Sequence, residues 1–316
     1  MMPRKILDAS ALSALVILIS AASLWAQGSD AVAVITELKL NRGDVQVRLP
    51  GKNNSERAGV LQSLVTGARV IASKDAAAVV LFIDGSKTVT VNEKNSPFEI
   101  AAAPAKGQGN PLGQIAPLLL GKKPPPTYTA LATRGTKKPP TLLSPRNTRL
   151  LSASPTLQWM GMDQQPGTVR LSGPEGPIWS AENIALTQIK YPANAAPLKP
   201  GVEYTWSLEK KGFPPEKVSF KILKADEAKE IQNRLASLQQ AAGTSPTTLA
   251  ILKSALLIST ELYHDARETL MEAVKSDPDE PTLHFLLGDV YDKTGLKTLA
   301  ADEYGEADFL GKGRAQ

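Results

Sequence analysis

The side chains that most often do chemistry in enzymes are scarce in this sequence. The chain has 316 residues, two histidines and no cysteine. Without cysteine there is no thiolate nucleophile, no disulfide and no cysteine-containing metal site. With His264 and His284 as the only imidazoles, a histidine-rich metal centre is excluded as well. These absences exclude cysteine-dependent catalysis and cysteine- or histidine-rich metal sites before any motif is considered.

The two histidines and the serines do not form a catalytic pattern. His284 falls at the start of an expected helix, where we expect a partner-facing or solvated imidazole, and His264 falls in an expected exposed turn. No Gly-x-Ser-x-Gly elbow is present. There is also no phosphate-binding loop, dinucleotide fingerprint or calcium-binding loop. We therefore predict a protein that is not an enzyme and that needs no cofactor or metal.

Asp289 and Asp292 are a carboxylate pair three residues apart, which places them on one face of a helix. Two carboxylates can serve a hydrolase only when a cleft encloses them. On a helical repeat, the same pair is more typical of a recognition surface for a basic or amide-rich partner.

The residues after position 225 show the apolar periodicity of helices. Ala228, Ile231, Leu235 and Leu238 recur at spacings of three and four. Ser245-Pro246 supplies an N-cap followed by a proline in the first turn. The pattern predicts helices near 226–241, 246–260, 263–275, 281–293 and 297–310.

A 34-residue self-similarity organises these helices. Ala266, Leu270 and Ala273 match Ala300, Tyr304 and Ala307, and the second unit contains Leu287-Gly288, Tyr291 and Gly295. This pattern resembles the tetratricopeptide repeat. The first unit departs from it, because Ser254, Leu257 and Glu261 stand where glycine, tyrosine and glycine are usual.

The resemblance implies a groove that holds a protein or peptide partner. Phe285 is then the preferred apolar anchor, and Asp289 and Asp292 read a basic or amide-rich partner. The positions that the resemblance assigns to the groove are Thr282, Phe285, Asp289, Asp292 and Lys293 in the second unit, and Ile251, Ala255, Ile258 and Ser259 in the first.

Residues 31–103 have the alternation and turns of a small β domain. Asp84-Gly85 between two β-rich runs predicts a hairpin. Gly43-Asp44-Val45-Gln46-Val47, the segment 64–70 and Asp84-Gly85-Ser86 together resemble the FecR-type β domain. The proteins after which that family is named are membrane-embedded signal transducers with a cytoplasmic arm. Only about five residues precede the apolar segment here, so the resemblance implies a periplasmic β module without sigma-factor regulation.

Residues 104–146 predict a semi-stiff basic linker. They contain nine prolines, seven lysines or arginines and no acidic residue. Either this stretch contacts an anionic polymer of the envelope, or it is a solvated spacer. Nucleic acid is not favoured, because the basic clusters are short and Tyr128 is the only aromatic residue among them.

Residues 147–224 are β-rich and contain Trp159, Trp179 and Trp206. Ser154-Pro155-Thr156-Leu157-Gln158-Trp159 and the segment 198–206 resemble an immunoglobulin-like or fibronectin type III sandwich. We expect Trp159 and Trp206 to face each other in its core. The alternative is that exposed aromatic rings form a platform for sugars.

The N-terminus has the parts of a secretory signal peptide, assigned to residues 1–26. A short basic start precedes a 16-residue apolar run from Ala9 to Leu24, and a small residue, Ala26, follows. An uncleaved anchor is the alternative. After cleavage no transmembrane span is expected, so the sequence predicts a periplasmic or secreted protein.

The sequence therefore predicts a multidomain α and β protein: an N-terminal β domain, a β-sandwich middle domain and an all-α tetratricopeptide-like repeat over 225–316. The net charge also differs between the β-rich part and the helical part. Residues 27–224 carry 25 basic and 14 acidic side chains, whereas residues 225–316 carry 9 basic and 16 acidic ones. The expected function is a non-enzymatic envelope scaffold that binds a protein partner. The alternative is a polymer- or glycan-binding module that uses the basic linker and the β domains.

Overall fold

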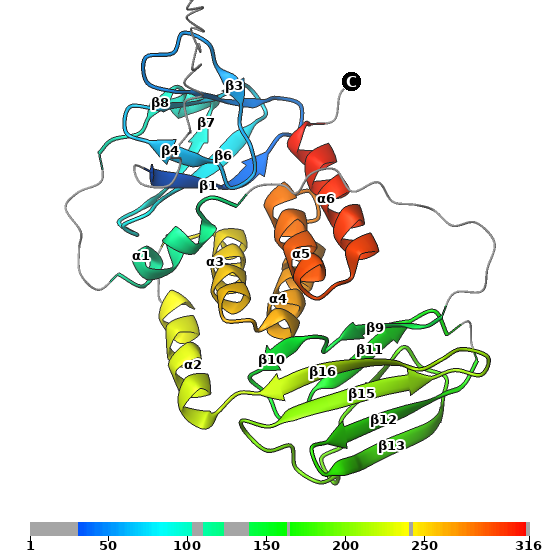
Figure 1. Cartoon of the computed structure of the whole chain (residues 1–316). Coiled ribbons are helices and arrows are strands. Elements are labelled where there is room, and N and C mark those ends of the chain that lie inside the picture. Colours follow the sequence, from blue (N-terminus) through cyan, green and yellow to red (C-terminus); the bar gives the residue numbers. More distant parts are fainter. Residues whose placement is uncertain (1–30, 103–109, 123–138, 163–164, 240–242, 314–316) are drawn as a thin grey trace, which may run out of the picture.

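The computed structural model describes residues 31–102, 110–122, 139–162, 165–239 and 243–313. The protein is mixed α and β, with a group of helices lying between two β regions (Figure 1). The expected signal peptide, 1–26, lies outside the described residues, as does part of the expected linker. Within the described ranges no helix is long and apolar enough to cross a membrane.

The N-terminal β region contains two four-stranded sheets. Their strand orders are β4–β1–β6–β7 and β3–β2–β5–β8. Strands β6 and β7 are antiparallel partners on either side of Asp84-Gly85, which confirms the predicted hairpin. The strands are β1 (Ala31–Lys39), β2 (Val45–Arg48), β3 (Glu56–Arg57), β4 (Ser63–Val65), β5 (Arg69–Ala72), β6 (Ala77–Phe82), β7 (Thr88–Asn92) and β8 (Phe98–Glu99), and a short 3₁₀ helix, η1 (Glu93–Asn95), follows β7.

Strand β1 is buried on both faces, which is unusual for an antiparallel sheet of this size. Six consecutive residues, 33–38, are buried. Ala33 and Ile35 belong to the core between the two sheets, whereas Val34 belongs to a core shared with the helices. The second face is covered because α3 and α5 pack against β1. This strand therefore connects the N-terminal β region to the helices.

The middle β region contains a five-stranded sheet, ordered β10–β16–β15–β12–β13, and a three-stranded sheet, ordered β14–β11–β9. Trp159 and Trp206 come from different sheets, and their ring centroids are 6.4 Å apart in the shared core, as the sequence predicts. The strands are β9 (Thr141–Ser144), β10 (Thr148–Leu150), β11 (Thr156–Met160), β12 (Gly167–Gly173), β13 (Gly176–Ile184), β14 (Gln188–Lys190), β15 (Glu203–Glu209) and β16 (Glu216–Ile222).

The helices of the C-terminal region begin and end within two residues of their predicted bounds. They are α2 (Ala225–Gln239), α3 (Pro246–Ser259), α4 (Tyr263–Ser276), α5 (Pro281–Lys293) and α6 (Lys297–Gly311). The side chain of Ser245 caps α3 by accepting a hydrogen bond from the backbone N–H of Thr248 at 2.9 Å, as the Ser-Pro signal predicts.

The middle β region contacts equivalent turns of the two helical units. The backbone N–H of Arg149 donates to the carbonyl of Glu261 at 2.9 Å, between α3 and α4. Arg146 donates from its side chain to the carbonyl of Thr294 at 2.8 Å, between α5 and α6. The helices therefore contact both β regions, on opposite sides in Figure 1.

The predicted linker 104–146 is not free of regular structure, which corrects the sequence-based expectation. Its described part contains α1 (Pro111–Ile115), the 3₁₀ helix η2 (Ala116–Leu119) and strand β9. Pro111 and Pro117 each occupy the first turn of a short helix. A proline there costs no hydrogen bond, because the first N–H groups of a helix have no partner within it.

Candidate partner-binding surface

The faces of α3 and α5 that the sequence assigns to a groove are covered by the chain itself. We call Ile251, Ala255 and Ile258 of α3, with Thr282 and Asp289 of α5, the inner surface. Helices α1 and η2 pack against α3, and β1 packs against both α3 and α5. Leu112, Ile115, Ala116 and Leu119 share one continuous apolar cluster with Ile251, Ala255 and Ile258.

An ion pair lies at the polar edge of this contact. Lys122, directly after η2, places its ammonium 2.7 Å from a carboxylate oxygen of Asp289, and both side chains are mostly shielded from solvent. Lys293 lies farther from the same carboxylate, at 3.9 Å. Asp289 therefore already contacts a cation, and that cation comes from the segment that covers the inner surface.

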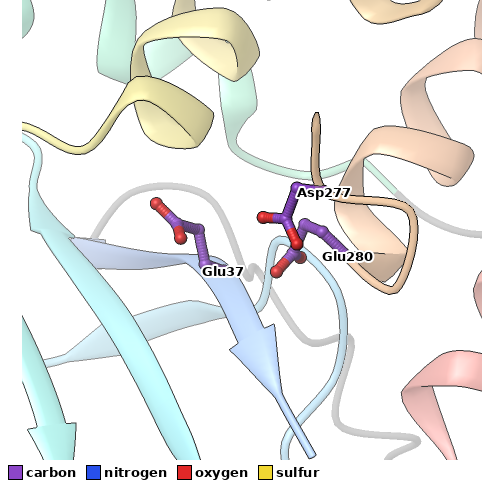
Figure 2. A group of neighbouring side chains, drawn as sticks. All are labelled: Glu37, Asp277 and Glu280. Carbon is purple, nitrogen blue, oxygen red and sulfur yellow. The ribbon is translucent and has the colours of Figure 1, made fainter. Parts of the chain in front are cut away.

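A cluster of carboxylates lies where β1 meets the start of α5. Figure 2 shows Glu37 on β1, with Asp277 and Glu280 on the loop that leads into α5. The ammonium of Lys39 contacts Asp277 and lies 3.1 Å from Glu280. The hydroxyls of Ser245 and Thr248 donate to Glu37. Each acid thus has a donor, as burial of charge requires.

Glu280 is the most enclosed member of the cluster. Its carboxylate accepts hydrogen bonds from the backbone N–H groups of Leu38 and Thr282, both at 3.1 Å. Burial disfavours the charged form and raises the pKa of Glu280 to about 7, although Lys39 acts in the opposite direction. Burial also lowers the pKa of Lys39, but its two carboxylate partners outweigh that effect and raise it overall.

The cluster has the composition of a cation site, but one cation, the Lys39 ammonium, already lies against two of its carboxylates. Oxygen atoms from Glu37, Asp277 and Glu280 all lie within 4.8 Å of one another. Carboxylate oxygens are the ligands that calcium and magnesium prefer. In this structure the Lys39 ammonium contacts two of the three acids, and a metal ion would have to displace it.

The predicted groove residues other than Phe285 fall into three groups in the structure. Thr282 and Ile251 are fully buried, and Ala255 and Ile258 are nearly so, beneath the covering segments. Asp289 and Lys293 lie at the edge of the inner surface. Ser259 and Asp292 lie at the ends of α3 and α5, where Ser259 donates to the Leu256 carbonyl and Asp292 pairs with Lys297 at 2.6 Å.

Phe285 does not present itself to a partner, which corrects its expected role as the anchor. The residue is 5% exposed, and its ring packs against Tyr304 of α6, with centroids 5.6 Å apart. Its side chain therefore stabilises the packing of α5 on α6. Removal of Phe285 would damage the fold before it tested any binding role.

His284 is buried rather than partner-facing or solvated. Nδ1 lies 2.8 Å from Glu303 and Nε2 lies 2.9 Å from the carbonyl of Pro278. Both neighbours only accept hydrogen bonds, so both ring nitrogens donate when the imidazole is charged. Burial opposes that charge, but the hydrogen bonds to Glu303 and Pro278 outweigh it and raise the pKa of His284.

His264 also differs from the expected exposed turn residue. It lies within α4, and its Nδ1 is 2.7 Å from the hydroxyl of Ser144 in β9. Burial lowers the pKa of His264. Ser144 is 3% exposed, so this serine–histidine pair is enclosed between the middle β region and α4. We interpret it as a contact between the two regions and not as a nucleophile with its base.

Sequence comparison adds no assignment to this geometry. No model of a known protein family matches the chain, and no curated protein matches it.

Sequence reasoning missed the covering segment and the carboxylate cluster. One signal for the segment was present: Leu112, Ile115, Ala116 and Leu119 have the spacing of one helical face, despite the surrounding prolines. No comparable signal marked the cluster, because Glu37 lies about 240 residues before Asp277 and Glu280. Only the packing of β1 on α5 brings them together.

Proposed function

We propose that this protein is a non-enzymatic scaffold of the bacterial cell envelope that binds a protein partner through the inner surface of α3 and α5. Export by residues 1–26 and a periplasmic or secreted location belong to the same proposal. So do the tetratricopeptide-like interpretation of the helices, the FecR-like interpretation of the N-terminal β region and the immunoglobulin-like interpretation of the middle region.

One observation carries the proposal. The inner surface holds a short apolar segment, 110–122, whose helices pack on α3 and whose lysine pairs with Asp289. The inner surface binds this segment through apolar side chains and a charged residue at its edge. Grooves that recognise amphipathic helices use the same combination. The helices also contact both β regions, and we take these contacts as support for a scaffold role.

A second candidate is a module that binds an anionic envelope polymer. It is favoured by the charge of residues 27–224, which carry 25 basic against 14 acidic side chains. Its glycan-binding form is less well supported, because Trp159 and Trp206 are 1% and 0% exposed and offer no platform.

Capture experiments with the full chain separate the two candidates. Immobilised wild type, Asp289→Lys and Asp308→Lys would be incubated with a bacterial envelope extract, with and without prior protease treatment. Asp308 lies on the exposed side of α6 and is the charge-matched control. We expect protease-sensitive capture that Asp289→Lys abolishes and Asp308→Lys retains. Capture that resists protease, disappears in high salt and ignores Asp289→Lys would overturn the scaffold proposal in favour of a polymer.

A further inference from the structure

We infer that residues 110–122 are an internal ligand of the inner surface, and that the partner is a short apolar helix of the same pattern that takes their place. The inference rests on the proposed function, since it names the class of partner for that surface. It follows from how this segment is seated and from what holds it there.

The segment buries one helical face and exposes the other. Leu112, Ile115, Ala116 and Leu119 are buried, at positions i, i+3, i+4 and i+7, whereas Gln114 and Pro117 are exposed. This spacing is the anchor pattern by which an amphipathic helix binds a groove. The prolines lie on or beside the open side, so they do not interrupt the apolar contact.

Polar contacts at the two ends fix the position of the segment. At its start, the Asn110 side chain accepts from the N–H of Leu112 at 3.0 Å and donates to the carbonyl of Gly85. At its end, Lys122 pairs with Asp289. The inner surface therefore accepts a short helix that has a capping residue at its start, one apolar face and a cation at its end.

Glycine at position 113 lets α1 approach the turn between β6 and β7. A Cβ at Gly113 would lie 2.5 Å from the carbonyl oxygen of Asp84, which is backbone and cannot move aside easily. This contact lies on the β region and not on the inner surface. A side chain at position 113 should therefore release the segment while leaving α3 and α5 unchanged.

The short regular structure of the segment favours exchange. Its own regular structure is limited to α1 and η2, which together span 111–119. Helices this short are not stable alone, so the segment is held by its contacts and a better ligand can replace it.

The partner is accordingly a helical peptide with a capping residue, apolar residues at i, i+3, i+4 and i+7, and a lysine or arginine about three residues after the last of them. Its cation would take the place of Lys122 at Asp289. Its apolar face would take the place of Leu112, Ile115 and Leu119.

Fluorescence anisotropy with a labelled peptide of residues 110–122 tests the inference. The binding proteins are full-length wild type, Gly113→Val and Leu112→Ser/Ile115→Ser, with circular dichroism to check that each is folded. The tethered segment competes at an effective concentration near millimolar, so we expect both variants to bind the peptide on the order of a hundredfold more tightly than wild type. A peptide with Leu112, Ile115 and Leu119 changed to serine should not bind, and Asp289→Lys added to Gly113→Val should weaken binding.

The outcomes separate this inference from the proposed function. If folded Gly113→Val does not bind the peptide, or binds the serine peptide equally well, the internal-ligand inference is wrong. If that variant nevertheless captures a protease-sensitive partner that Asp289→Lys abolishes, the scaffold proposal stands without it. If the peptide binds as expected and no envelope protein is captured, the inner surface is a ligand site but the scaffold proposal fails.

Discussion

At the scale of single residues, Glu280 shows how contact between regions changes the chemistry of a side chain. Its carboxylate is buried between β1 and the start of α5, with Lys39 as its cation. A buried ion pair is weak evidence for stability, because desolvation offsets much of the attraction. The pKa of Glu280 is raised because desolvation outweighs the attraction of Lys39. The contact between β1 and α5 is therefore sensitive to pH.

We predict that Glu280→Gln makes the protein less sensitive to pH between about 5 and 8. The pKa of Glu280 is about 7 in the folded protein against an ordinary value of 4.5, so folding favours the protonated acid. The stability that this group contributes is fully present below 4.5 and is lost as pH rises through 7. That loss amounts to about 3 kcal/mol.

Glutamine cannot titrate, so relative to wild type the variant should gain up to that amount as pH rises. Urea unfolding at several pH values measures it. Glu272→Gln, on the exposed side of α4, is the control and should leave the pH dependence unchanged. A difference between Glu280→Gln and wild type that stays constant with pH would contradict the prediction.

At the scale of elements, the helices were predicted well and their packing partners were not. Local signals such as the Ser245 cap, the Pro246 first turn and the apolar periodicity determine where a helix begins and ends. Gly288, a small residue of the repeat pattern, lies against the Tyr304 ring and lets α5 and α6 pack closely. Which element covers the other side of each helix depends on residues far away in sequence, so β1 and α1 were not foreseen there.

We predict opposite effects for alanine at Gly288 of α5 and at Gly305 of α6. A Cβ at Gly288 would lie 2.8 Å from the Tyr304 ring, so Gly288→Ala should push α6 away and destabilise the protein by about 1–3 kcal/mol. A Cβ at Gly305 would meet nothing within 4 Å. Gly305→Ala should therefore stabilise by up to about 1 kcal/mol through helix propensity. Denaturant unfolding of both variants checks this, and a stabilised Gly288→Ala would show that α5 and α6 are not packed as described.

At the scale of the whole molecule, one core joins the N-terminal β region to the helices while the middle β region keeps its own. The first includes Val34 and Leu81 from strands, Leu112 and Ile115 from the covering segment, and many residues of α3 and α5. The core around Trp159 and Trp206 draws only on residues 142–222. The middle β region and the helices should therefore differ in whether they fold when they are cut from the rest of the chain.

We predict that a fragment of residues 139–224 folds alone and that a fragment of residues 225–316 does not. The first retains its complete core, including the tryptophan pair. The second exposes the apolar inner surface that β1 and α1 cover in the whole chain. Near-ultraviolet circular dichroism for the former, and thermal unfolding with light scattering for the latter, measure the difference. A helical fragment that is monomeric and melts cooperatively would show that the inner surface needs no cover.

The sequence by itself determined the mixed α and β class, the helix bounds, the hairpin at Asp84-Gly85 and the burial of Trp159 and Trp206. These depend on periodicity, caps and turns, which act over a few residues. The tertiary structure alone decided the burial of His284, the inward turn of Phe285, the carboxylate cluster and the occupation of the inner surface by residues 110–122. Desolvation and charge pairing in those places arise between residues far apart in the chain, so no local pattern records them.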